Sequence, residues 1–136
     1  MTAMTVSLRG IPDTEASIGW AGVHSVIVDR PEGKAGGRGL GFNGGQLLGL
    51  AIGGCFCNDL HYVAHEMGIT LTGVAVDVTV TFDGTPLRAT SAAVHVVVEA
   101  ADETADLETL IRKAQETSTV SNSISSGVPV SVSTRR

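Results

Sequence analysis

The sequence predicts an α+β domain in which a long hydrophobic helix lies on an antiparallel sheet. Segments 74–82 and 92–100 alternate apolar and polar residues on either side of a turn, which is typical of an antiparallel strand pair with one face in water. Segment 46–67 has helical spacing, and a second, amphipathic helix is expected within 102–116. Strands, helix, strands, helix and a last strand in this order favour an α+β architecture.

The N-terminal third is expected to hold two strands and a glycine-rich loop. Met4, Val6 and Leu8 alternate within 4–10, and residues 21–31 are expected to form a second strand that ends at Pro31. Segment 32–45 is a long loop, and long loops in compact domains are often functional. It lacks the Gly-Lys-Ser/Thr ending of a phosphate-binding loop.

The central helix is expected from Gln46 to Met67, with Gly68 as its stop signal. One face is predicted from residues that recur every three or four positions: Leu48, Ile52, Cys55, Asp59 and Tyr62. Three glycines inside this helix each cost about 1 kcal/mol relative to alanine. We therefore expect a compensating close approach of another backbone, such as a partner helix in a dimer, at these glycines: Gly49, Gly53 and Gly54.

The second half of the chain carries two further patterns. The inward side of the strand pair is predicted to be Val74, Val76, Val78, Val80, Phe82, Val94, Val96 and Val98. The buried stripe of the second helix is predicted to be Leu107, Leu110, Ile111 and Ala114. Residues 128–133 alternate and are expected to form a short final strand.

Composition narrows the function. The 136 residues suggest a single domain over 1–136, and the low charged fraction of 17% suggests an oligomer. The net charge is -5 and no Lys/Arg cluster occurs, so binding of nucleic acid or of an anionic membrane is not expected. The longest strongly apolar run, 47–57, is too short to span a bilayer, and we see no signal peptide. Two cysteines make no disulfide framework, which favours a cytoplasmic location.

Two segments, "QLLGLAIGGCFCNDLHYVAHEMG" and "VSNSISSGVPVSV", and the "FDG" turn between them resemble the OsmC/Ohr family of osmotically inducible and organic-hydroperoxide-resistance proteins. The resemblance runs from about Gly19 to Val132. It implies an OsmC-like fold, an intertwined homodimer, two equivalent sites between the subunits and no cofactor. It also implies a stress-response activity, in which a reactive cysteine reduces a hydroperoxide, a second cysteine forms a disulfide with it, and a thiol donor restores both.

The resemblance can be followed residue by residue. Cys55 matches the reactive cysteine in "GGC". Ser118 stands in the place of the second cysteine, Gly45 in that of a glutamate, and Trp20, less securely, in that of an arginine. Of the four chemical groups that the resemblance implies, this chain keeps one.

A reactive Cys55 would need help to form a thiolate. A free thiol with a pKa of ~8.5 is only a few per cent ionised at neutral pH. Cys55 lies nearly three turns into its expected helix, whereas the helix dipole acts mainly on the first turn. A cation is therefore expected near it, with Arg38 and Arg30 as candidates and Lys34 as a further one. The pocket residues are predicted to be Trp20, Asp59, Tyr62 and Ser118.

Each of these residues also has a plain structural interpretation. Cys55 and Cys57 would serve equally well as small buried hydrophobes. A bond between them is not expected, because residues two apart point about 200° apart around a helix. Cys57, His61 and His65 share a stripe about 12 Å long, so we expect no single metal site there, and solvation explains the histidines. Ser118, Ser121 and Asn122 resemble a helix cap.

Two functions remain open. The chain could be a thiol-dependent reductase of organic hydroperoxides that works through Cys55 alone, with an external thiol in place of the second cysteine. Alternatively, it could be a redox-inactive protein of the same fold that binds an apolar small molecule in the dimer-interface pocket.

Overall fold

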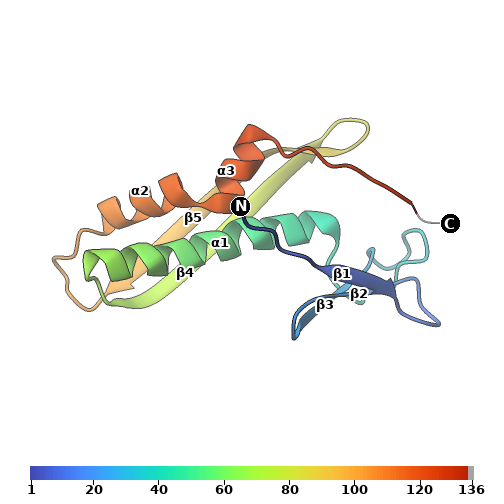
Figure 1. The fold of residues 1–136 in the computed structure, drawn as a ribbon, viewed down its shortest axis with the longest axis horizontal. Coiled ribbons are helices and arrows are strands. Elements are labelled where there is room, and N and C mark those ends of the chain that lie inside the picture. The colour runs from blue at the N-terminus through green and yellow to red at the C-terminus, as the bar shows by residue number, and fades with distance from the viewer. Residues whose placement is uncertain (135–136) are drawn as a thin grey trace. The chain divides into compact units, whose positions relative to one another are not determined.

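The computed structural model describes residues 1–134, which form five strands and three helices. The chain divides into two compact units, Met1–Leu48 and Gly49–Arg136. The elements follow one another as β1 Ser7–Gly10, β2 Ser17–Ala21, β3 His24–Val28, α1 Gly44–Met67, β4 Leu71–Asp83, β5 Arg88–Ala100, α2 Leu107–Thr117 and α3 Thr119–Ser126 (Figure 1).

The first unit contains an antiparallel sheet in the order β1-β2-β3. Leu8 pairs with Gly19 and Trp20 pairs with Ser25. The sequence did not predict β2, and the strand expected over 21–31 is shorter, at His24–Val28. A Cβ at Gly19 would lie 3.3 Å from the Leu8 Cγ, so this glycine allows the leucine side chain of β1 to pack over β2. With only Ile18 and Trp20 alternating around Gly19, β2 is too short to give a clear strand signal of its own.

The glycine-rich segment after β3 is an ordered loop that packs against this strand. The Phe42 N–H donates to the Ile27 carbonyl at 2.9 Å, and the Asp29 N–H donates to the Phe42 carbonyl at 3.0 Å. A Cβ at Gly41 would lie 2.0 Å from the Ile27 carbonyl oxygen. The loop therefore comes closer to β3 than any residue with a side chain would allow.

The ends of α1 follow from its sequence. Asn43 and Gln46 form a reciprocal capping box, in which each side-chain oxygen accepts from the other residue's N–H at 2.9 and 3.0 Å. At the other end Gly68 has φ +67°, and the Ile69 N–H donates to the Ala64 carbonyl at 2.8 Å. The predicted stop at Gly68 is confirmed, and the helix starts two residues earlier than expected.

Of the five residues whose spacing predicted this helix, only Ile52 is buried. The residues that are buried are Ile52, Gly53, Phe56, Leu60, Val63 and Ala64. Tyr62, predicted to line a pocket near Cys55, is 69% exposed. The first half of the helix is apolar around most of its circumference, so spacing alone did not single out one face. The expected close approach at a glycine exists at Gly53, but toward β4: a Cβ there would lie 3.0 Å from the Val78 Cγ2, whereas a Cβ at Gly54 would meet nothing within 4 Å.

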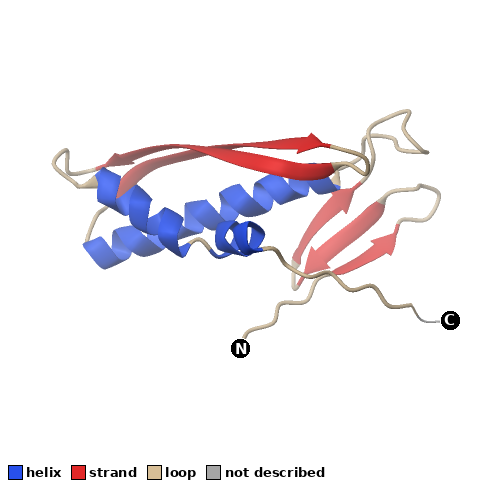
Figure 2. Cartoon of the chain, turned by 90° about the horizontal axis from the view of Figure 1, so that it is seen from above, coloured by secondary structure: helices blue, strands red, loops and turns tan. Residues whose placement is uncertain are grey.

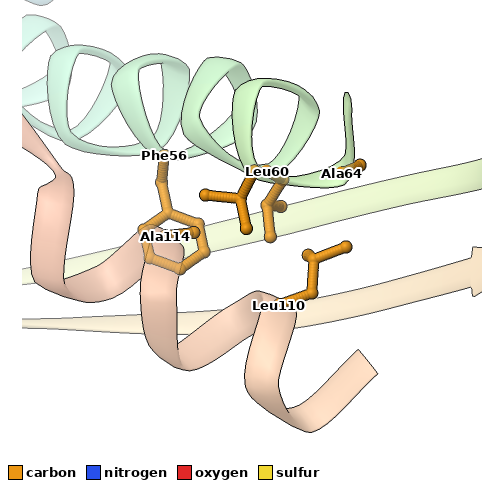
Figure 3. Packing of buried hydrophobic residues seen from close by; sticks show 6 residues of the cluster. Phe56, Leu60, Ala64, Leu110 and Ala114 are labelled. Carbon is orange, nitrogen blue, oxygen red and sulfur yellow. The ribbon is translucent and has the colours of Figure 1, made fainter. Parts of the chain in front are cut away.

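The second unit has helices on one face of the β4–β5 hairpin (Figure 2). The predicted antiparallel pair is confirmed, and its register places Val76 opposite Val96 and Val78 opposite Val94. The amphipathic helix is α2, and the Asp106 side chain caps it by accepting from the Thr109 N–H at 3.0 Å. The core cluster lies between α1, α2 and the valines of both strands, and is made of Phe56, Leu60, Val63, Ala64, Leu110 and Ala114 (Figure 3).

The prediction of a last strand over 128–133 is wrong, because the described residues 127–134 have no regular structure. Val128, Val130 and Val132 alternate but are largely exposed. A segment with this alternation forms a β-strand only when it can hydrogen-bond to a neighbouring strand. The described part of the chain provides no such neighbour for these valines.

The helix α1 is long and apolar enough to cross a membrane by length and composition alone. The core helix of a soluble protein meets the same criteria. Its residues Phe56 and Leu60 belong to the core cluster, which favours this second interpretation.

Candidate functional site

The site is built around Cys55, a half-buried free cysteine of α1. It lies one turn before Asp59, on the edge of the helix between its buried and its exposed faces. The Cys55 Sγ donates to the Asp59 Oδ2 at 3.6 Å. Residues four apart on a helix are neighbours, so the helix alone fixes this pair.

The surroundings of this pair carry little positive charge. The helix α1 contains no lysine or arginine, and its only acidic residues are Asp59 and Glu66. In the described residues of the unit Gly49–Arg136, the one ion pair joins Arg112 and Glu116, both on α2. No described cation of this unit therefore pairs with Asp59. A carboxylate beside a sulfur opposes negative charge on that sulfur, so a thiolate at Cys55 would need a cation from another source.

Arg30 and Arg38, the predicted cations, belong to the unit Met1–Leu48 and surround a buried carboxylate there. The Asp29 side chain is 1% exposed and accepts from the N–H groups of Arg30, Arg38 and Leu40 at 2.8, 3.1 and 3.0 Å. The pKa of the Asp29 carboxyl is lowered, chiefly by the hydrogen bond from the Leu40 N–H. Burial acts in the opposite direction, whereas the N–H groups of Arg38 and Arg30 and the charge of Arg30 lower this pKa further. Sequence analysis missed Asp29, whose only signal is its place just before the glycine-rich loop.

The two arginines differ in whether the guanidinium already has partners. The Arg30 guanidinium pairs with Asp29 at 3.2 Å and also donates to the Glu15 carbonyl. Arg38 contributes its backbone N–H to Asp29, and its residue is exposed. Arg38 is therefore the better candidate for a partner at a thiolate, and this role stays a prediction.

Trp20 lines an apolar concavity of about 280 Å³ in the first unit, together with Val6, Leu8 and Val26. The indole is 37% exposed, and the Arg9 guanidinium lies 5.7 Å from its ring centroid. A cation thus stands beside the residue that replaces the arginine implied by the resemblance. Sequence analysis did not single out Arg9, because a lone arginine on a strand carries no motif.

Ser118, the residue in the place of the second cysteine, is fully buried between α2 and α3. It is the N-cap residue of α3, as its resemblance to a cap predicted, but its side chain makes no capping hydrogen bond. Its hydroxyl has no hydrogen-bond partner among residues 1–134. Ser121 and Asn122 lie inside α3, and the Asn122 side chain donates to the Glu116 carbonyl at 3.0 Å.

Cys57 and the two histidines do not converge. Cys57 is a half-buried free thiol, and His61 and His65 are exposed. Residues 1–134 contain no group of three or more His, Cys, Asp or Glu side chains arranged to hold a metal ion.

Comparison with known proteins identifies the family. The profile of the family described as OsmC-like protein matches residues 36–133. An OsmC-like protein from Mycoplasma pneumoniae has a solved structure with a TM-score of 0.75 at 14% identity, covering 91% of this chain and 88% of its own. An organic hydroperoxide resistance protein from Legionella pneumophila gives 0.66 at 22% identity, with coverage of 90% and 88%.

A third solved structure, the organic hydroperoxide resistance protein OhrB of Bacillus subtilis, gives a TM-score of 0.54 at 23% identity, with 89% of each chain covered. At these identities the likeness shows the fold alone. None of the curated proteins matches this sequence. The family profile covers most of the chain, and the solved structures share its α+β fold. This chain belongs to the OsmC-like protein family.

Proposed function

We propose that this protein reduces organic hydroperoxides through Cys55, with an external thiol as the reductant. The observation that carries the proposal is the half-buried, free Cys55 thiol in the middle of α1. The resemblance of the "GGC" segment matches this residue to the family's reactive cysteine. Cys55 is neither fully buried nor fully exposed, next to the buried residue Phe56 of the same helix.

The reaction balances with the groups of this chain and one thiol donor. The Cys55 sulfur, having lost its proton, attacks the terminal oxygen of ROOH. The S–O bond forms, the O–O bond breaks, and RO⁻ takes up a proton to leave as an alcohol. The sulfenic acid then reacts with one donor thiol, which releases water and leaves a mixed disulfide, and a second thiol restores Cys55. Cys57 is not required, since it points away around the helix.

The test compares three proteins in turnover of cumene hydroperoxide with a dithiol donor. The wild type and Cys57→Ser are expected to turn over at similar rates, and Cys55→Ser is expected to fall to background. Mass spectrometry after one equivalent of peroxide, with a sulfenic-acid trap, should label Cys55. Background turnover in the wild type, or full turnover in Cys55→Ser, contradicts the proposal.

Ser118 allows a second test of the same site. If it occupies the place of a second cysteine, Ser118→Cys should form a disulfide with Cys55 when peroxide is added. The variant would then run faster on a non-reducing gel, and the additional change Cys55→Ser should abolish that shift. Ser125→Cys, at an exposed position of α3, is the matched control. A peroxide-treated Ser118→Cys protein that keeps two or more free thiols and runs unchanged speaks against this placement.

We further propose that the working form is a homodimer in the cytoplasm. Only eight hydrophobic residues of the described chain are buried, while Leu50 of α1 and the valines of 128–132 are exposed. The alternating valines need a partner strand, and a second copy could supply it. Light scattering should give twice the 14.0 kDa of one chain, and Leu50→Arg should lower that mass. A 14.0 kDa wild type at micromolar concentration would contradict the dimer.

The apolar concavity beside Trp20 supports a second candidate, the binding of an apolar small molecule. Trp20 is the only tryptophan, so its fluorescence reports on this concavity directly. Titration with a medium-chain alcohol should shift the emission if the concavity binds ligand. Saturable binding by a protein in which Cys55 resists peroxide would favour this function over the first.

A further inference from the structure

We propose that Asp59 sets the charge class of the molecules that react at Cys55, so that neutral and cationic substrates are accepted and anionic ones are repelled. The proposal rests on the proposed function for the identity of the reacting sulfur. It extends that function to the substrate, and it makes Asp59 a residue that determines specificity.

The Asp59 carboxylate lies beside the Cys55 sulfur. The Asp59 Oδ2 lies 3.6 Å from the Cys55 Sγ, and both residues are half-buried. A peroxide must bring its terminal oxygen onto the sulfur, so the remainder of the substrate passes close to this carboxylate. The pair is fixed by the helix and does not depend on any loop.

Among residues 1–134, no lysine, arginine or histidine forms an ion pair with Asp59. The helix α1 has no lysine or arginine, and α3 has no charged residue. The helix α2, which packs on α1, carries Arg112 and Lys113; Arg112 pairs with Glu116 at 3.2 Å, and neither residue pairs with Asp59. Glu66 adds a second negative charge farther along α1. Two unit charges about 4 Å apart interact by roughly 1 kcal/mol even in bulk water, which is about fivefold in rate, and by more where water is partly excluded.

The rate of reaction at Cys55 should therefore depend on the charge of the substrate. A neutral alkyl or aryl hydroperoxide reaches the sulfur without penalty. A fatty-acid hydroperoxide with its carboxylate near the reacting end would meet Asp59 and react more slowly.

The experiment measures the charge preference directly, in a Cys57→Ser background that leaves one thiol. The reagents are methanethiosulfonates of similar size, one carrying a trimethylammonium group and one a sulfonate, with the methyl reagent as the neutral reference. The rate of the cationic reagent is divided by the rate of the anionic reagent, and this ratio is divided by the same ratio measured with free cysteine. The cationic reagent is expected to react roughly three- to tenfold faster than the anionic one. Asp59→Asn should bring this ratio close to one.

Asp77→Asn is the matched control, because it removes an equal charge from an exposed position on β4; the ratio should stay at the parent value. A parent ratio near one, or an Asp59→Asn ratio equal to that of the parent, overturns the proposal. If Asp59→Asn does not fold, the parent protein decides alone: in 1 M salt its ratio must shrink, because the Debye length falls to about 3 Å. These reagents label any accessible thiol, so a Cys55 that resists peroxide would refute the proposed function without affecting this result.

Discussion

Removal of the buried Ser118 hydroxyl is predicted to stabilise the protein. The side chain is 0% exposed, and its Oγ has no hydrogen-bond partner among residues 1–134. A serine at an N-cap position usually stabilises its helix by about 0.5–2 kcal/mol through a side-chain hydrogen bond. Ser118 makes no such bond, so Ser118→Ala has none to lose.

The magnitude follows from two opposing effects. A buried hydroxyl without a partner costs about 1–3 kcal/mol of desolvation, which the substitution recovers. The space left by one oxygen, of the order of 15 Å³, costs about 0.4 kcal/mol at ~24 cal/mol per Å³. The balance is a gain of about 0.6–2.6 kcal/mol in the free energy of unfolding. At this chain length each kcal/mol raises Tm by roughly 3–5 °C.

Urea and thermal unfolding, followed by circular dichroism at one fixed protein concentration, measure this gain. Ser125→Ala is the control, since Ser125 is exposed in the same helix and reports only the difference in helix propensity. The urea m-value should not change. A Ser118→Ala protein that is less stable than the wild type by more than 0.5 kcal/mol, a threshold of about the surface-mutation scatter, would mean that the hydroxyl has a partner in solution, and the reasoning would be wrong.

Three further substitutions test the framework of the molecule. Asp29→Asn should reduce the loss of unfolding free energy at acid pH, because the pKa of the Asp29 carboxyl is lowered in the folded chain. The stabilisation from the ionised carboxylate is complete above about pH 4 and is lost as the pH falls through the lowered pKa. Urea melts of the wild type and the variant should therefore converge at acid pH. Leu110→Ala should cost about 3–4 kcal/mol of unfolding free energy in the same melts, because Leu110 is fully buried in the core cluster; a loss below about 1 kcal/mol contradicts that packing. Gly41→Ala should lower Tm, because its Cβ would overlap the Ile27 carbonyl, whereas Gly44→Ala, whose Cβ would meet nothing within 4 Å, should not; equal Tm values for both refute the close approach.

Local signals predicted the parts of the fold that depend on neighbours in the sequence. The alternating valines of 74–82 and 92–100 predicted β4 and β5, because a strand pair joined by a short turn brings its own partner. Gly68 marked the end of α1, because only a residue that tolerates positive φ fits there. The resemblance of the "GGC" segment predicted the family, which the family profile shows.

The errors concern features that depend on distant parts of the chain. Residues 128–133 have the pattern of a strand but no strand beside them in the described chain. The spacing that predicted α1 did not identify its buried face, because Leu48 and Tyr62 fit helical spacing as well as Phe56 and Leu60 do, and the packing of β4 and α2 decides between the faces. Asp29 escaped notice for a similar reason, since its partners Arg38 and Leu40 bind it through backbone N–H groups that any residue could supply.

Glycine content is often taken as a sign of mobility, and the segment between β3 and α1 shows how misleading that can be. Here the small residues let one stretch of main chain lie directly against another, and the Asp29 carboxylate holds the loop through hydrogen bonds from the Arg38 and Leu40 N–H groups. Such a segment should resist proteases in the native protein and tolerate neither an inserted tag nor a lengthened linker. An engineer looking for a permissive site would do better at the exposed β4–β5 turn, around Asp83 and Leu87.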